Sequence, residues 1–173
     1  QPNTPWLSAE FVNPLFLRGA CVALERENQK WFPKGLVGTK QVFSFYTKSI
    51  ARNLGAGRDG SDELVRPTNQ ALAAIASEMA ANRRDYVPHS DAIRIVDGRF
   101  HAYPAPPGTT WFEILQRNGL FRLDPDPRER RADPFAAPED IVRFSFQRLQ
   151  DHLMASVILE TVINPADALK SGA

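Results

Sequence analysis

Residues 142–157, VRFSFQRLQDHLMASV, change their hydrophobic period partway along. Apolar and polar residues alternate from Val142 to Phe146, which is the period of a strand with one buried face. From Phe146 onward the apolar residues recur at Leu149 and Leu153, the spacing of one face of an α-helix. The stretch therefore predicts a strand that leads directly into a helix.

Short elements broken by prolines precede this strand and helix. We expect first a brief helix from Ser90 to Val96 and then a tight turn at Asp97-Gly98. A second helix follows, which Thr109 caps and which carries Trp111, Ile114 and Leu115 on one face. After it we expect a strand within 120–123 and a polar excursion over 124–138. The order helix, helix, strand, wing, strand, helix is that of a winged-helix domain.

Longer helices are expected on the N-terminal side. They begin near Pro14, Thr39 and Asp62, and their short connections favour a small helical bundle. A further helix-start pattern, Asn164-Pro165, follows the last predicted helix. The sequence thus predicts a mainly α fold, a helical bundle followed by a winged-helix domain. The expected domains are a helical domain at 1–85, the winged-helix domain at 86–163 and the start of a further helical region at 164–173.

The charge and composition exclude several classes of protein. With 21 Lys and Arg against 20 Asp and Glu, the net charge of +1 gives no strong field to hold the chain on a polyanion, so nucleic acid is not an expected partner. The single cysteine, Cys21, excludes an internal disulfide framework. No apolar stretch approaches the ~20 residues that span a bilayer. We therefore expect a soluble, cytoplasmic protein with no membrane partner.

Neither the cysteine nor the histidines indicate a catalytic or metal site. Cys21 could be the nucleophile of a Cys/His hydrolase, but a free cysteine more often packs as a small hydrophobe, so we expect a buried thiol. His89, His101 and His152 are not spaced three or four residues apart, as two metal ligands on one helix face would be. We expect no catalytic residues and no metal site, with His152 on the surface of its helix.

A stand-alone winged-helix DNA-binding regulator is the alternative that the element order leaves open. Such a regulator needs a basic recognition helix, yet the helix expected over 109–118 offers only Arg117 against Glu113. The basic runs at 83–84 and 128–131 have acidic neighbours that cancel most of their charge, so we expect solvated loops there.

Two aromatic residues in the same helix, Trp111 and Phe112, could stack on bases. Aromatic side chains on one face of an amphipathic helix more often belong to the hydrophobic core. We therefore expect both rings in the core.

Segments at opposite ends of the chain resemble the NACHT/STAND family of signalling ATPases. Residues 13–17, NPLFL, followed by FPKGL at 32–36, look like the segment that closes the nucleotide-binding domain of that family and opens its helical domain. Residues 142–155 resemble the last strand and helix of the family's winged-helix domain, particularly in prokaryotic members such as the Avs antiphage sensors. The preceding NGLF at 118–121 is similar to the family's approach to that strand.

The resemblance implies a regulatory module of a nucleotide-switched ATPase in bacterial antiphage defence or signalling. In the family the proline of NPLFL packs against adenine, which implies Pro14 and Leu15 as nucleotide contacts. ATP or ADP would be held by an upstream domain, because this chain has no G-x-x-x-x-G-K-[ST] phosphate loop. The chain would then be no enzyme by itself. Its implied partners are that nucleotide-binding domain and a downstream sensor domain of the same parent, whose homo-oligomerisation is left open.

The chain departs from the family at the end of the predicted strand. Many animal members place there a histidine that touches the nucleotide phosphate, and this sequence has Phe146. The family's phosphate contact is therefore not carried over to this position. The chain also begins with Gln1 rather than Met, from which we expect a piece of a longer protein.

Overall fold

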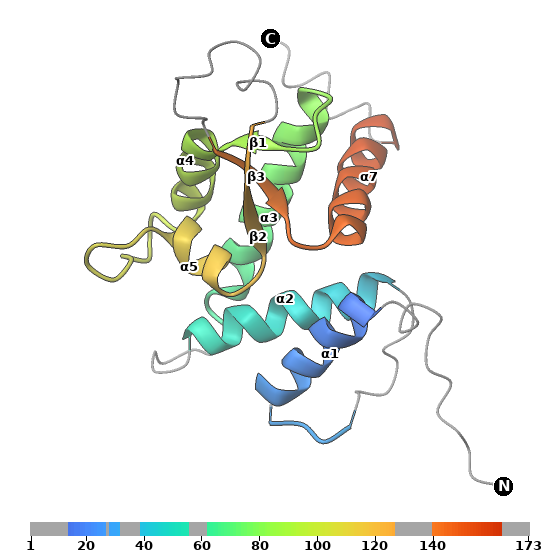
Figure 1. Ribbon diagram of the computed structural model, residues 1–173, viewed down its shortest axis with the longest axis vertical. Coiled ribbons are helices and arrows are strands. Elements are labelled where there is room, and N and C mark those ends of the chain that lie inside the picture. Colours follow the sequence, from blue (N-terminus) through green and yellow to red (C-terminus); the bar gives the residue numbers. More distant parts are fainter. Residues whose placement is uncertain (1–13, 27, 32–38, 56–61, 127–139, 164–173) are drawn as a thin grey trace, which may run out of the picture. The chain divides into compact units, whose positions relative to one another are not determined.

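The computed structural model describes residues 14–26, 28–31, 39–55, 62–126 and 140–163 (Figure 1). They form two compact units, the first up to Arg66 and the second from Pro67 onward. The fold is mainly helical with one small sheet, as the sequence predicted. Its elements are α1 (Pro14–Arg26), α2 (Thr39–Gly55), α3 (Val65–Ala81), β1 (Val87–Pro88), α4 (His89–Arg99), α5 (Trp111–Arg117), β2 (Phe121–Pro125), β3 (Asp140–Phe144) and α7 (Gln147–Ile163).

The first unit is built on the packing of α1 against α2. Helix α1 buries the small side chains of Ala20 and Ala23, whereas α2 buries larger ones such as Phe43 and Ile50. The distance between two packed helices depends on the side chains at their contact, so the alanines let the larger residues of α2 fill the space between them.

An exposed ion pair joins the end of α2 to the segment before α3. Arg52 bonds to both carboxylate oxygens of Asp62, through Nε to Oδ1 and through Nη2 to Oδ2 at 3.2 Å. Lys48 Nζ lies 4.0 Å from the same carboxylate. The hydrogen bond from Arg52, helped by the two positive charges, holds the pKa of Asp62 below its ordinary value of 3.8.

Arg52→Gln is expected to raise the pKa of Asp62 toward 3.8, which an NMR titration of the side-chain carboxyl would measure. A carboxyl whose pKa is lowered by folding stabilises the fold above its unfolded pKa, and this contribution is lost as the pH falls through the folded pKa. The contribution of Asp62 to stability is therefore present at neutral pH, and its dependence on pH lies below about pH 4. Arg94→Gln, which removes a separate ion pair with Asp91 at 2.9 Å, is the control. An unchanged Asp62 pKa in Arg52→Gln would contradict the assignment.

Helix α3 belongs to the second unit apart from its first two residues. From the sequence we expected this helix in one helical domain at 1–85 with the first two, whereas the two compact units of the structure divide between Arg66 and Pro67. Leu72, Ile75 and Met79 form an apolar stripe at helical spacing on α3, and all three are buried. A stripe shows that a helix packs on something, but it does not show which neighbour covers it.

The second unit contains a three-stranded antiparallel sheet in the order β1-β3-β2. In the central strand, Val142 lies opposite Val87 of β1 and Leu123 of β2. The sequence did not predict β1, because two residues are too few to carry an alternating pattern. The order α3, β1, α4, α5, β2, β3 is that of a winged helix, and 127–139, where most of the predicted polar excursion falls, lie outside the described residues. Helix α7 follows directly and packs against β3.

Helix α4 is longer than the sequence predicted. It runs from His89 to Arg99 with Pro88 as its N-cap, so it includes Gly98 and the expected tight turn at Asp97-Gly98 is wrong. Turn preferences of a dipeptide are local and weak, and burial of a helix face overrides them. The next helix, α5, is capped by Thr110 and not by Thr109 as expected.

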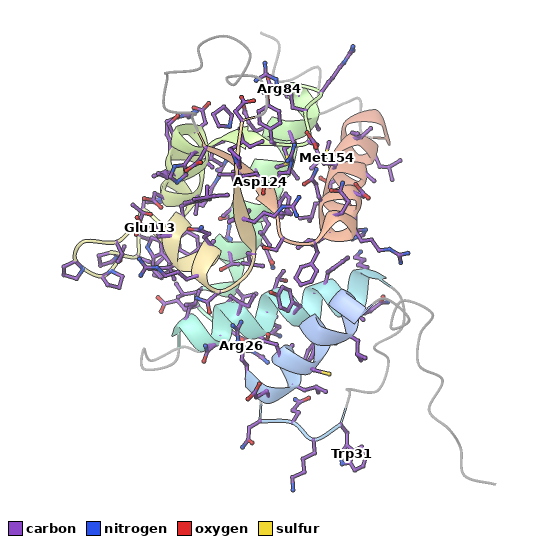
Figure 2. All side chains as sticks on the ribbon, in the orientation of Figure 1. Arg26, Trp31, Arg84, Glu113, Asp124 and Met154 are labelled. Carbon is purple, nitrogen blue, oxygen red and sulfur yellow. The ribbon has the colours of Figure 1, made fainter. Side chains whose placement is uncertain are left out.

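Aromatic rings pack against one another in the second unit, whose side chains Figure 2 draws as sticks. Phe112 is fully buried, and its ring centroid lies 5.1 Å from that of His89 and 5.7 Å from that of Phe121. Phe121 and Phe144, which are opposite each other in β2 and β3, have centroids 5.4 Å apart. The rings therefore tie α4 and α5 to the sheet. Because Trp111 is also buried, the prediction that both aromatic residues of this helix belong to the core is confirmed.

Two glycines of the second unit should respond in opposite directions to alanine. Gly98 is helical, and no atom lies within 4 Å of an added Cβ, so Gly98→Ala is expected to stabilise by about 0.5–1 kcal/mol. Gly108 has φ 75°, a left-handed conformation in which alanine costs about 1–2 kcal/mol. Urea unfolding of the two variants measures both effects. The same sign in both would show that backbone conformation does not decide the response.

Candidate functional site

Pro14 and Leu15, the implied nucleotide contacts, are the first two residues of α1. A proline at the first helical position needs no backbone donor, so the predicted helix start is observed. The surroundings of the two side chains lie outside what the structure describes, as does Asn13 before them. Their contact with a nucleotide stays a prediction.

Side chains of the second unit accept hydrogen bonds from backbone amides at the N-terminus of α5, which we call its closed N-terminus. Thr110 Oγ1 accepts a hydrogen bond from the Glu113 amide at 3.1 Å, and Glu113 Oε2 accepts one from the Thr110 amide at 3.4 Å. This reciprocal pair is a capping box. A third acceptor comes from the preceding helix, because Asp97 Oδ1 accepts from the Phe112 amide at 3.1 Å. The amides of Thr110, Phe112 and Glu113, which usually remain unsatisfied at the start of a helix, therefore have partners here.

The closed N-terminus of α5 carries two carboxylates where a DNA-binding winged helix would present its recognition helix. A helix N-terminus ordinarily attracts phosphate through its free amides and its dipole. Asp97 and Glu113 occupy those amides and would repel a phosphate. Arg117, the cation of this helix, lies 3.8 Å from Glu113. Two carboxylates therefore lie where a DNA-reading winged helix would approach a phosphate.

The connection between α4 and α5 also differs from that of a DNA-binding helix-turn-helix. It spans Phe100–Thr110, whereas the usual turn has about 3–4 residues. The Phe100 ring stacks on Trp111 with centroids 4.4 Å apart, and Trp111 Nε1 donates to the Tyr103 carbonyl at 2.6 Å. Figure 1 shows this connection extending away from α4 and α5. It is held in place at its base and presents its tip to solvent.

Arg143 of β3 links three segments on the other face of the sheet. Its Nη1 lies 3.1 Å from Asp124 Oδ2 in β2, and its Nη2 lies 3.3 Å from Asp85 Oδ2 after α3. The guanidinium also lies over the Tyr86 ring at 6.0 Å. Gln150 of α7 donates to the Asp85 carbonyl at 3.1 Å. These contacts hold the strands, the end of α3 and α7 together, which is a structural role.

The thiol of Cys21 is exposed, so the expectation that it would be buried is wrong. Helix α1 turns its alanines toward α2, which leaves Leu17, one turn before Cys21, 38% exposed. Because small and large apolar residues occur on both faces of α1, its sequence does not show which face α2 covers. Because every histidine of the chain lies beyond Arg66, the unit that contains Cys21 supplies no histidine base for a hydrolase.

The histidines lie in separate environments within the second unit. His89 packs on Phe112, His101 Nδ1 lies 3.1 Å from the Gly98 carbonyl oxygen, and His152 is half-buried on α7 rather than fully on its surface. In the described part of the chain, no three His, Cys, Asp or Glu side chains are arranged to hold a metal ion.

Two further findings bear on partners. Of the helices that the structure describes, none is long and apolar enough to cross a membrane. Arg83 and Arg84 are exposed, and Arg84 lies over the Tyr86 ring at 5.7 Å. The second basic run, at 128–131, lies outside the described residues.

No protein-family model matches the chain, and neither a curated protein nor a solved structure is found to be similar to it. The class of protein is therefore defined by the fold alone, a helical unit followed by a winged-helix unit. Of the segments that resemble the NACHT/STAND family, 142–155 spans most of β3 and the first half of α7, the predicted strand and helix. The FPKGL segment at 32–36 lies outside the described residues.

Sequence reasoning missed two side chains that shape these sites. Asp97 was assigned to a turn, although an acidic residue before a helix start is a capping signal that can also act from a distant element. Arg143 was taken only as the polar member of an alternating strand. Its partners Asp85 and Asp124 are far from it in the sequence, so no local pattern identifies them.

Proposed function

We propose that this chain is the regulatory helical and winged-helix part of a nucleotide-switched STAND ATPase that acts in the cytoplasm, in bacterial antiphage defence or signalling. ATP or ADP is bound by an upstream domain of the parent chain, and the winged helix closes over it in the resting state. A downstream sensor domain releases this closure. The chain itself hydrolyses no nucleotide and holds no metal.

The observation that supports the proposal most is the closed N-terminus of α5. A winged helix that reads DNA uses that end of its recognition helix against the bases. Here three amides at that end are engaged by the side chains of Thr110, Asp97 and Glu113, and the two carboxylates disfavour nucleic acid. A winged helix without a DNA-reading end fits a domain that contacts other parts of its own protein.

The order of the two units gives further support. A helical unit begins at Pro14 and a winged-helix unit ends in the strand and helix of 140–163, which is the order that the resemblance implies. A nucleotide switch needs two arrangements of its domains with different contacts in each. Each of the two units is compact in itself, as bodies that move in such a switch must be.

Calorimetric titration of ATP and ADP tests the proposal, with this chain compared to a version extended upstream through the preceding domain. We expect only the longer version to bind, with Pro14→Ala weakening its binding by about tenfold, or about 1.4 kcal/mol. Pro107→Ala, in the second unit and exposed, is the matched control and should bind as the unaltered protein does. If the longer version binds neither nucleotide, the proposal is wrong.

The DNA-binding alternative predicts a different result in a fluorescence anisotropy titration with a labelled duplex. We expect no affinity tighter than the non-specific range of about 10⁻⁴–10⁻⁶ M at physiological salt. Neutralising the two carboxylates, Asp97→Asn with Glu113→Gln, should change this little, because only Arg117 on α5 carries positive charge. Tight, sequence-selective binding by the unaltered chain would favour the regulator instead.

A further inference from the structure

The connection between α4 and α5 contains a proline-rich segment that the proposed function does not use. Residues 103–108 read YPAPPG. Proline fixes its own φ near −65° and disfavours the helical region for the residue before it. Tyr103, Ala105 and Pro106 each precede a proline. Covalent geometry therefore favours, for this segment, the extended conformations that include polyproline II.

Contacts at both ends hold the segment in place. At the first end, the Tyr103 carbonyl accepts from Trp111 Nε1 at 2.6 Å. At the second end, the Pro106 carbonyl accepts from the Thr109 amide at 3.1 Å and from Thr109 Oγ1 at 2.8 Å. Proline in the second position and Gly108 at φ 75° in the third match a type II turn. Contacts within the chain thus order the segment before any other protein binds.

The three prolines of the segment are exposed, whereas Tyr103 and Ala105 are half-buried. A polyproline II helix has three residues per turn, so residues three apart share an edge. Pro104 and Pro107 are three apart and share one edge, with Pro106 exposed between them. Two prolines at P-x-x-P spacing are therefore presented outward.

We propose that residues 103–107 are a docking site for a partner protein domain with an aromatic-lined groove that binds polyproline II. Such grooves favour P-x-x-P segments because the bound conformation already exists and little entropy is lost on binding. Here Trp111 and the turn at Gly108 have ordered the segment beforehand, and Figure 1 shows it at the tip of a connection that extends from the unit. The proposal is independent of nucleotide and of the parent ATPase.

NMR titration of the isotope-labelled chain tests this proposal, with an isolated SH3 domain and an isolated WW domain as probes of two groove types. We expect saturable shifts confined to 103–109 and to the indole N–H of Trp111. Pro104→Ala and Pro107→Ala should each weaken binding by about tenfold or more, as expected for the anchors of a small interface. Ala105→Ser, between them, should stay within about twofold.

The unbound variants provide the structural check. An unchanged Trp111 indole resonance in free Pro104→Ala shows that the connection keeps its shape, so this variant decides the outcome if Pro107→Ala disturbs the turn. The proposal is overturned if neither probe shifts residues 103–109, if the shifts map to another surface, or if Pro104→Ala binds as tightly as the unaltered chain.

Discussion

Phe112→Ala is expected to destabilise the winged-helix unit by about 3–5 kcal/mol. Phe112 is fully buried and its ring meets those of His89 and Phe121, so truncation opens a cavity where α4, α5 and β2 join. Set against a usual net stability of about 5–15 kcal/mol, this loss would leave the unit marginally folded. Urea unfolding followed by Trp111 fluorescence measures it.

A single-tryptophan background and a matched control variant make this measurement specific for the second unit. The chain has two other tryptophans, Trp6 and Trp31, and replacing both by phenylalanine leaves Trp111 as the reporter of the second unit. Leu159→Ala is the matched control, because Leu159 is 54% exposed on α7 and its truncation should change stability by no more than about 0.5 kcal/mol. Equal losses in Phe112→Ala and Leu159→Ala would contradict the description of the core.

Ile75→Ala is expected to destabilise the same unfolding transition by about 2–5 kcal/mol. Ile75 is fully buried in α3, the helix that the structure groups with the winged helix and the sequence grouped with the first helices. If α3 belongs to the second unit, truncation at Ile75 must lower the stability that Trp111 reports. The same urea titration in the single-tryptophan background measures the effect.

Ser77→Ala on the same helix is the control for Ile75→Ala. Ser77 is exposed and its Oγ bonds to the Ala73 carbonyl at 2.9 Å, a local contact that does little for a helix. Alanine also has the higher helix propensity, so stability should change by no more than about 0.5 kcal/mol. A Trp111 transition that does not shift in Ile75→Ala would place α3 outside the winged-helix unit.

Where sequence and structure agree, the deciding interactions are local. The change of period at Phe146 predicted β3 and α7, because burial of one strand face and one helix face both leave repeats in neighbouring residues. The helix expected over 109–118 has Asn118 as its C-cap, and Gly119 after it has φ 83° with the Leu120 amide bonded to the Leu115 carbonyl at 3.1 Å. This is a Schellman cap, a helix ending that a single glycine after the helix indicates in the sequence.

Where they differ, the deciding interactions join distant residues. Strand β1 exists because Val87 pairs with Val142, and two residues carry no periodicity of their own. Cys21 is exposed because α2 covers the opposite face of α1, which no pattern within α1 specifies. Asp97 caps α5 across a long connection. The sequence therefore predicted the helix that carries the candidate site, but it did not predict that the carboxylates of Asp97 and Glu113 accept hydrogen bonds at its N-terminus.

The sheet order has a kinetic consequence. Strands β2 and β3 are neighbours in the chain and need only the wing to close between them, whereas β1 comes from before α4 and α5. Closing a longer loop costs more entropy, and distant pairings form more slowly. We therefore expect the β2–β3 hairpin to form early and β1 to join last, so that α3 is fastened to the hairpin only in the final step of folding.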